Sequence, residues 1–262
     1  MKGYPADYTW ALKGYELWAL RSMDDIPVLN KLTNEINPSA VLGFTFAKIQ
    51  ADKLTSDDLL SILKTLEINI DENYGLYTTQ SLTSHVGKWH SILYQGLLIS
   101  FLVWLRDNSL KEYNGQVETK IRRCIDFAID YGENCNICVR KDGYVQLNEF
   151  PNDELSEVLN GSLVYAVALE SATTLLSKRQ KEHLELVRKS ICILVDRCDK
   201  GLWSLYQPDT GNYATPDYHN LHISLLGHLI RTNRCCYGVL EPVHKRWSLG
   251  AKSMNARLGA LI

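Results

Sequence analysis

Apolar residues recur every three or four positions along most of the chain, and the strict alternation expected of half-buried strands is scarce. A period of three to four residues is typical of amphipathic helices. The pattern predicts helices over residues 39–50, 56–69, 88–106, 115–131, 155–176, 180–199, 219–232 and 240–257, with a weaker one near 8–22. The predicted fold class is therefore all-α.

The predicted helices are of two kinds. Some are apolar or small on nearly every side: 88–106, 155–176 and 219–232. Others alternate charged residues with Leu and Ile: 56–69, 115–131 and 180–199. A helix that is apolar all round is buried, and an amphipathic one lies outside. Because the two kinds alternate along the chain, we predict an incomplete (α/α) toroid of helical hairpins, forming one domain over residues 1–262.

The loops before the three buried helices, at 72–89, 140–154 and 201–218, are rich in polar and aromatic residues. In a toroid these loops open on the same end, where three helix N-termini offer unpaired N–H groups and a partial positive charge. An anion such as a phosphate or a carboxylate is the natural ligand of such an end. The alternative is that the aromatic loops only plug the end of the bundle.

The composition narrows the possible partners. Hydrophobic residues make up 45% and charged residues 22%, and the net charge of -2 gives no basic field for nucleic acid. No run has the roughly 18 apolar residues of a membrane span, and the N-terminus lacks a signal-peptide core. We expect a cytoplasmic protein with no membrane partner; the oligomeric state is left open.

The seven cysteines do not form a recognisable framework. Cys135 and Cys138 have the spacing of zinc ligands, but no second spaced pair accompanies them. We expect buried or inert thiols, with no metal and no cofactor.

The segment "DYHNLHISLL" begins the last buried helix. Asp217 is expected to cap this helix, which would place Tyr218 at the first helical position, facing the polar end. His219 and His222 lie one turn apart on the same face. The pair lacks the glutamate of H-E-x-x-H, so a metal site is disfavoured. Two alternatives stay open: hydrogen-bonded structural histidines, or histidines that contact substrate.

A second candidate is Glu149 in "LNEFPNDE". Pro151 fixes an extended backbone near it, and Leu147 and Phe150 can exclude water from its carboxyl group. Burial of this kind raises the pKa of a carboxyl group and makes its ionised form a stronger base. The alternative is a glutamate that caps or bridges a loop.

Further polar and aromatic residues accompany these candidates. Asn160 and Gly161 interrupt an apolar helix; close helix packing would explain the glycine, and a polar contact inside the barrel would explain the asparagine. Trp203 and Tyr206 resemble the rim of a sugar site, where aromatic faces stack on pyranose rings.

Four segments, taken in order, resemble the C-terminal helical domain of the D-glucuronyl C5-epimerase family. They are "WHSILYQGLLISFLV", "NEFPNDELSEVLNGSLVYAVAL", "LWSLYQPDTGNYATPDYHNLHISLL" and "VHKRW". The family carries the motifs Q-G-x-x-I-S, V-L-N-G and D-Y-H-x-x-H-I in this order. The resemblance spans about residues 74 to 250.

The resemblance implies an isomerase that inverts C5 of glucuronic acid in a saccharide, without a metal. It implies that Glu149 and Tyr218 transfer the protons and that Tyr206 assists them. Catalysis must also stabilise an enolate beside a carboxylate. The expected substrate-binding residues are Tyr74, Trp89, Gln95, Asn160, Trp203, His219 and His222, and the expected partner is a uronate-containing saccharide or a small carboxylate-bearing substrate.

The sequence also departs from the family. Phe150 stands where the family has a tyrosine, and "QPDTGNYATP" shortens a segment that bears an arginine. The substrate carboxylate would then need another cation, for which Lys88, Arg140 and Lys141 are candidates. No β-rich segment precedes the helical part of this sequence.

These departures keep other functions open. One is a biosynthetic tailoring enzyme, an isomerase, cyclase or lyase, acting on a small or peptide-derived substrate. Another is a toroid that binds a ligand or a partner protein without chemistry.

Overall fold

The computed structural model describes residues 28–30, 35–36, 38–50, 52–79, 87–108, 113–150 and 157–259. It is mostly helical, which confirms the all-α prediction. The helices are α2 (Pro38–Gln50), α3 (Ser56–Ile68), α4 (Ile92–Asn108), α5 (Asn114–Asp130), α6 (Leu159–Ser171), α7 (Lys178–Cys198), α8 (Pro216–Thr232), α9 (Arg234–Tyr237) and α10 (Glu241–Gly259). The helix predicted near 8–22 lies outside the described residues. Within the described ranges, no helix has the length and apolar character that crossing a membrane requires.

Short antiparallel hairpins stand where the sequence showed only polar loops. Their strands are β1 (Val28–Asn30) with β2 (Glu35–Ile36), β3 (Tyr77–Thr78) with β4 (Trp89–His90), β5 (Cys138–Arg140) with β6 (Val145–Leu147), and β7 (Leu205–Gln207) with β8 (Asn212–Tyr213). Each of the last three hairpins directly precedes an inner helix: α4, α6 or α8.

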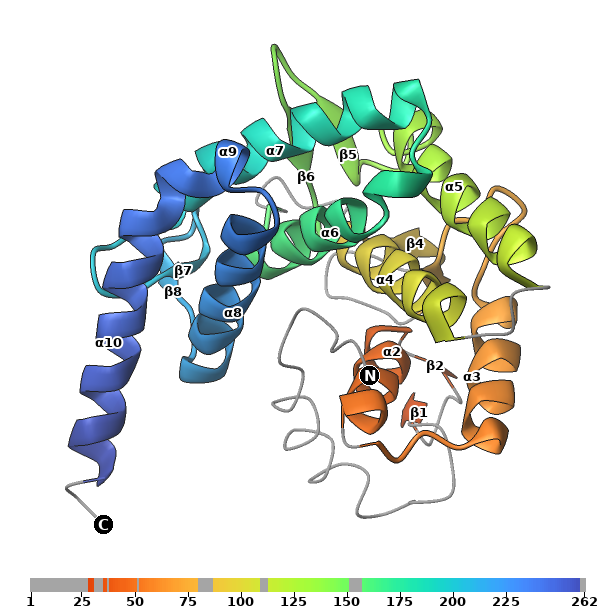
Figure 1. Ribbon diagram of the computed structural model, residues 1–262, viewed down its shortest axis with the longest axis horizontal. Coiled ribbons are helices and arrows are strands. Elements are labelled where there is room, and N and C mark those ends of the chain that lie inside the picture. The colour runs from red at the N-terminus through yellow and green to blue at the C-terminus, as the bar shows by residue number, and fades with distance from the viewer. Residues whose placement is uncertain are drawn as a thin grey trace.

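The helices form two rows that follow an open arc (Figure 1). Helices α2, α4, α6 and α8 contact one another in that order along the inner row. Helices α3, α5, α7 and α10 each pack against an inner helix from outside. Every residue of α6 from Leu159 to Glu170 is buried, as expected for a run that is apolar on all sides. The predicted layers agree with this arrangement, while the toroid as such stays a prediction.

Helices α4 and α6 cross with their backbones in close approach at Gly96. A Cβ atom on Gly96 would lie 2.8 Å from both the Cα and the N atom of Tyr165. Real Cβ atoms do not come so close to backbone, so only glycine allows this crossing. The close crossing sets the N-termini of the two helices side by side.

The inner helices α4, α6 and α8 do not begin at the residues that the sequence predicted. The sequence placed their starts at Lys88, Leu155 and His219, whereas α4, α6 and α8 start at Ile92, Leu159 and Pro216. The first difference arises because Trp89 and His90 pair with β3 as strand β4 instead of continuing the helix. The second arises because Val158 has the extended backbone of an N-cap residue, with φ -120° and ψ 134°.

The start of α8 corrects a second prediction. Thr215, not Asp217, is the N-cap: its hydroxyl accepts a hydrogen bond from the Tyr218 N–H at 3.4 Å. Pro216 takes the first helical position, where the fixed φ of proline suits a helix start and its missing N–H costs nothing. Tyr218 is therefore the third helical residue and not the first.

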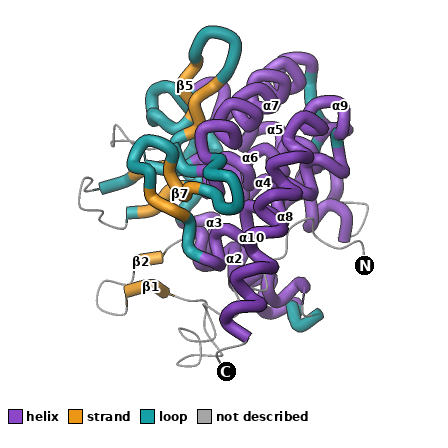
Figure 2. The backbone as a smooth tube through the Cα atoms, turned by 90° about the vertical axis from the view of Figure 1, so that its left-hand side faces the viewer, coloured by secondary structure: helices purple, strands orange, loops and turns teal. Residues whose placement is uncertain are grey.

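The hairpins gather at one end of the helical arc. Figure 2 shows β5 and β7 together on the same side of the helices. The N–H of Ile92, at the start of α4, donates to the carbonyl of Asn148 at 3.1 Å, which ties this helix to the segment after β6. The polar loops and the helix N-termini thus share one end of the molecule, as the sequence predicted.

Candidate active site

Glu149 lies directly after β6 and against the first turn of α6. Its side chain is only 6% exposed. A Cβ atom on Gly161 would lie 2.8 Å from Glu149 Oε2, so the carboxyl group occupies the space that any other residue at 161 would fill. Side chains of α4 also lie close, with Leu93 Cβ at 3.4 Å from such an atom, so the close helix packing expected from the sequence is present beside the contact with Glu149.

The Glu149 carboxyl group is buried, and one of its oxygen atoms lacks a hydrogen bond. Burial raises its pKa to about 8. Its Oε2 atom has no hydrogen-bond partner among the described residues. A buried polar atom without a partner is uncommon because desolvation is costly. The carboxyl group is therefore mostly protonated at neutral pH and has an acceptor atom ready for a ligand.

Tyr206 on β7 and Tyr218 on α8 form a contacting pair of phenols. Their ring centroids lie 4.8 Å apart at 57°. Burial raises the pKa of both hydroxyls, and the nearby Glu149 carboxyl group raises them further. A hydrogen bond between the two hydroxyls raises the pKa of Tyr206 and lowers that of Tyr218. One acid and two neutral phenols from three separate segments thus come together.

Asn160 stands beside Gly161 in the first turn of α6. Its side chain is buried, and its Oδ1 atom also lacks a hydrogen-bond partner among the described residues. The first turn of α6 therefore carries an unpaired amide oxygen next to the residue that accommodates the unpaired carboxyl oxygen of Glu149.

Gln95 and Trp89 help to shape the region. Gln95 is fully buried, donates from Nε2 to the Leu76 carbonyl at 2.8 Å and accepts from the Leu76 N–H at 3.3 Å. Its amide thereby anchors the chain that enters β3. Trp89, 4% exposed, packs against Tyr94 and Phe150 with ring centroids 5.3 and 6.3 Å apart. These rings form an apolar surface, and one of them, Phe150, directly follows Glu149 in the sequence.

His219 and His222 are fully buried and both contact Ser204. The Ser204 hydroxyl lies 2.8 Å from His219 Nδ1 and 2.9 Å from His222 Nδ1. His219 Nδ1 also accepts from the Ser204 N–H, so its proton is on Nε2, which donates to the Trp247 carbonyl at 3.2 Å. The structure thus shows the hydrogen bonding of the first alternative and does not itself test a contact with substrate.

Trp203 and Tyr74 make contacts with other residues. Trp203 stacks on His219 with ring centroids 3.8 Å apart and donates from Nε1 to the Ala214 carbonyl at 2.8 Å. Tyr74 has the Arg123 guanidinium over its ring at 3.9 Å and lines a cavity between α3, α4 and α5. Neither contact brings these rings to Glu149.

Sequence reasoning missed the roles of Ser204 and Trp247. Ser204 bridges the two histidines, and Trp247 on α10 accepts a hydrogen bond from His219. Both residues lie in segments that resemble the family, but the sequence does not indicate that they contact the two histidines. Among the described residues, no three His, Cys, Asp or Glu side chains gather as metal ligands.

A comparison with protein families identifies the chain at family level. The model of the D-glucuronyl C5-epimerase C-terminus matches residues 64–248, more than half of the sequence. The chain belongs to this family. The D-glucuronyl C5-epimerase match includes Glu149, Tyr206 and Tyr218 and extends from α3 into α10. No curated protein matches the chain.

Membership of the D-glucuronyl C5-epimerase family places the chain with epimerase-like isomerases. Phe150, which stands where the family pattern has a tyrosine, packs its ring on Trp89. Lys88 is one of the cations proposed above to replace the arginine of the shortened segment. Its Nζ atom lies 3.4 Å from Asp71 Oδ2 and 4.2 Å from the centroid of the Tyr77 ring.

Proposed function

We propose that the protein is an isomerase that removes and returns a proton at the carbon next to the carboxylate of a uronic acid unit. The observation that carries the proposal is the buried Glu149 carboxyl group, with an unpaired oxygen, beside two neutral phenols. Membership of the D-glucuronyl C5-epimerase family supports it.

In the proposed reaction, Glu149 takes the proton from C5. The C–H bond breaks, its electron pair forms an enolate with the adjacent carboxylate, and the carboxylate of Glu149 becomes a carboxylic acid. A raised pKa makes the ionised form of Glu149 a stronger base. Because only a fraction of the enzyme is ionised at neutral pH, the rate should increase as the pH rises toward 8.

Tyr218 then donates its hydroxyl proton to the opposite face of the same carbon, which gives the inverted centre. Tyr206 stabilises the phenolate left behind, since a hydrogen bond from Tyr206 lowers the pKa of Tyr218. Tyr218 regains its proton from solvent before the next turnover, and Glu149 releases its proton.

The substrate carboxylate is expected at the N-terminus of α6. This helix begins without a side-chain cap, and the first N–H groups of a helix favour an anion. The same partial charges stabilise the dianionic enolate that forms during the reaction. This helix end can thus supply part of the attraction that the family's arginine would give.

The test is hydrogen exchange at C5 in deuterated water. A glucuronate-containing oligosaccharide and free glucuronate are incubated with the protein, and deuterium at C5 is followed by NMR. Glu149→Gln should lower the exchange rate at least about a hundredfold, the loss typical of a missing general base. Glu67→Gln, at an exposed residue of α3, is the matched control. Wild-type exchange in Glu149→Gln, or none in the folded wild-type protein, contradicts the proposal.

A second candidate is a tailoring enzyme acting on a smaller substrate. The observation that favours it is Phe150, which removes the hydroxyl of the family's tyrosine and packs its ring on Trp89. If such an enzyme is a lyase, it shares the first proton transfer but expels the C4 substituent. A new near-ultraviolet absorbance from an unsaturated product would distinguish this reaction from epimerisation.

A further inference from the structure

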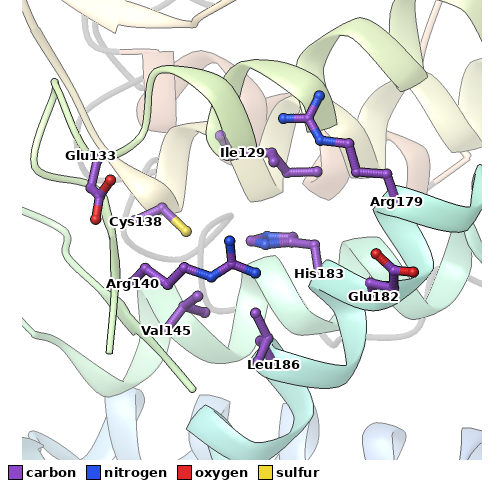
Figure 3. A pocket seen from close by; sticks show the side chains of 10 residues that line it. Ile129, Glu133, Cys138, Arg140, Val145, Arg179, Glu182, His183 and Leu186 are labelled. Atoms are coloured by element: carbon purple, nitrogen blue, oxygen red, sulfur yellow. The ribbon is translucent and has the colours of Figure 1, made fainter. Parts of the chain in front are cut away.

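A second cavity lies on the outer side of the helical arc, between hairpin β5–β6, α5 and α7 (Figure 3). Its volume is about 340 Å³, within the range of small-molecule sites. Ile129, Val145 and Leu186 supply apolar wall, and Arg140, Arg179 and His183 supply polar groups. Neither Glu149 nor the residues proposed to act with it line this cavity.

His183 lines the cavity and is held by a hydrogen bond to Tyr165. The fully buried Tyr165 hydroxyl lies 3.0 Å from His183 Nε2. When the Tyr165 hydroxyl donates to Nε2, the neutral ring carries its proton on Nδ1. Burial, together with the charges of Arg140 and Arg179, lowers the pKa of His183 to about 4. The ring is therefore neutral at pH 7.

Two guanidinium groups line the cavity together with the carboxyl groups of Glu133 and Glu182. Figure 3 shows the Arg140 side chain, from the end of β5, extending toward His183. No ion pair within the described part of the chain engages Arg140. Arg179, in the first turn of α7, pairs with Asp130 and keeps further N–H groups.

The acidic side chains of the cavity lie toward its edges. Glu133 and Glu182 are exposed and stand at opposite sides of the view in Figure 3. The Cys138 thiol is buried, and burial raises its pKa to about 12, so it carries no charge at neutral pH. Figure 3 thus shows the Arg140 guanidinium next to the His183 ring, between the two glutamates.

We propose that this outer cavity binds a small organic phosphate or sulfate of about monosaccharide size. Arg140, from β5, and Arg179 and His183, from α7, carry several N–H groups that can donate to the oxygens of a tetrahedral oxyanion. The apolar wall accommodates the body of the ligand. Arginine presents paired N–H donors that match such oxyanions. The proposal is independent of the reaction at Glu149.

The test is titration of the full-length protein by calorimetry and by NMR of the His183 ring at constant ionic strength. The probes are inorganic sulfate, inorganic phosphate, glucose 6-phosphate and glucuronate. Glucose 6-phosphate should bind most tightly, and an oxyanion in the cavity should raise the pKa of His183. A His183→Gln variant identifies the resonance by its loss.

Two variants on the same hairpin separate a built site from general charge attraction. Arg140→Gln should weaken glucose 6-phosphate binding about tenfold, whereas Lys141→Gln removes the same charge from an exposed neighbour outside the cavity and should change it less than twofold. Both positions are exposed, so both variants should fold, and melting temperatures check this. The proposal is overturned by equal weakening in the two variants, by glucuronate binding as tightly as glucose 6-phosphate, or by an unchanged His183 resonance with every probe.

Discussion

At the scale of single residues, the most restrictive contact in the candidate site is that between Gly161 and Glu149. The carboxyl oxygen lies where a side chain at 161 would begin. Asn160 and Gly161 were noticeable in the sequence because they interrupt an apolar run, yet the pattern could not reveal what the glycine faces. That depends on how the segment after β6 folds against the start of α6.

We expect Gly161→Ala to lower C5 exchange strongly while it changes stability little. The new Cβ atom, 2.8 Å from Oε2, must displace the Glu149 carboxyl group, whereas alanine favours the helix by about 1 kcal/mol over glycine. The measurements are the exchange rate and the melting temperature. Gly115→Ala is the control, because a Cβ atom on Gly115, in α5, would meet nothing within 4 Å. Equal exchange in the two variants would show that the contact does not matter.

The phenol pair shows what residue patterns leave undetermined. Tyr206 and Tyr218 are both recognisable as candidates from the family resemblance. Their contact at 4.8 Å arises because hairpin β7–β8 folds back on the start of α8. The same hairpin carries Trp203 and Ser204 toward the two histidines. Contacts made by a short hairpin leave no periodic signal in the sequence.

At the scale of elements, the period of three to four residues was enough to predict α2 to α8 and α10 as helices. The predicted starts of the inner helices were wrong by several residues, because short-range pairing and capping decide them. β4 takes Trp89 and His90, and Thr215 with Pro216 starts α8 earlier than the apolar pattern does. Periodicity reports which face is buried and carries little information on where a helix begins.

The close crossing of α4 and α6 leads to a stability prediction. We expect Gly96→Ala to reduce the free energy of unfolding by about 1–3 kcal/mol, the usual cost of overpacking a core. The Cβ atom would meet the backbone of Tyr165 at 2.8 Å, and backbone cannot rotate away as a side chain can. Urea unfolding measures the change. Gly115→Ala is again the reference variant. If Gly96→Ala were as stable as Gly115→Ala, the crossing of the two helices would not be tight.

At the scale of the whole molecule, the sequence predicted that the polar loops share one end, and the structure confirms this for the hairpins β5–β6 and β7–β8. The reason is general: in consecutive helical hairpins, every inner helix runs in the same direction. The arc in Figure 1 is open over the described residues. The outer cavity was not predicted, because it combines residues from α5, β5, β6 and α7 that share no motif.

The buried Glu149 should make the stability of the whole protein depend on pH. Its pKa is about 8 in the folded state, above the ordinary value of 4.5, so the folded state holds a proton that the unfolded chain has released between these values. Stability relative to Glu149→Gln should therefore be constant below pH 4.5, fall as the pH rises toward 8, and level off above it. The slope is at most about 1.4 kcal/mol per pH unit.

Urea unfolding of both proteins at several pH values measures this difference. Glu67→Gln, at an exposed position, should show no such trend relative to wild type. A difference between wild type and Glu149→Gln that is the same at about pH 5 and about pH 8 would contradict a raised pKa for Glu149.

The contact between Gly161 and Glu149 also limits how the protein can vary. A side chain at 161 would displace the end of the Glu149 side chain from its present position. Alanine at 161 would therefore move the acid away from its present place beside the phenols. Retaining both residues is therefore a joint constraint, and their co-occurrence in a related sequence is a more informative marker of this chemistry than either residue alone.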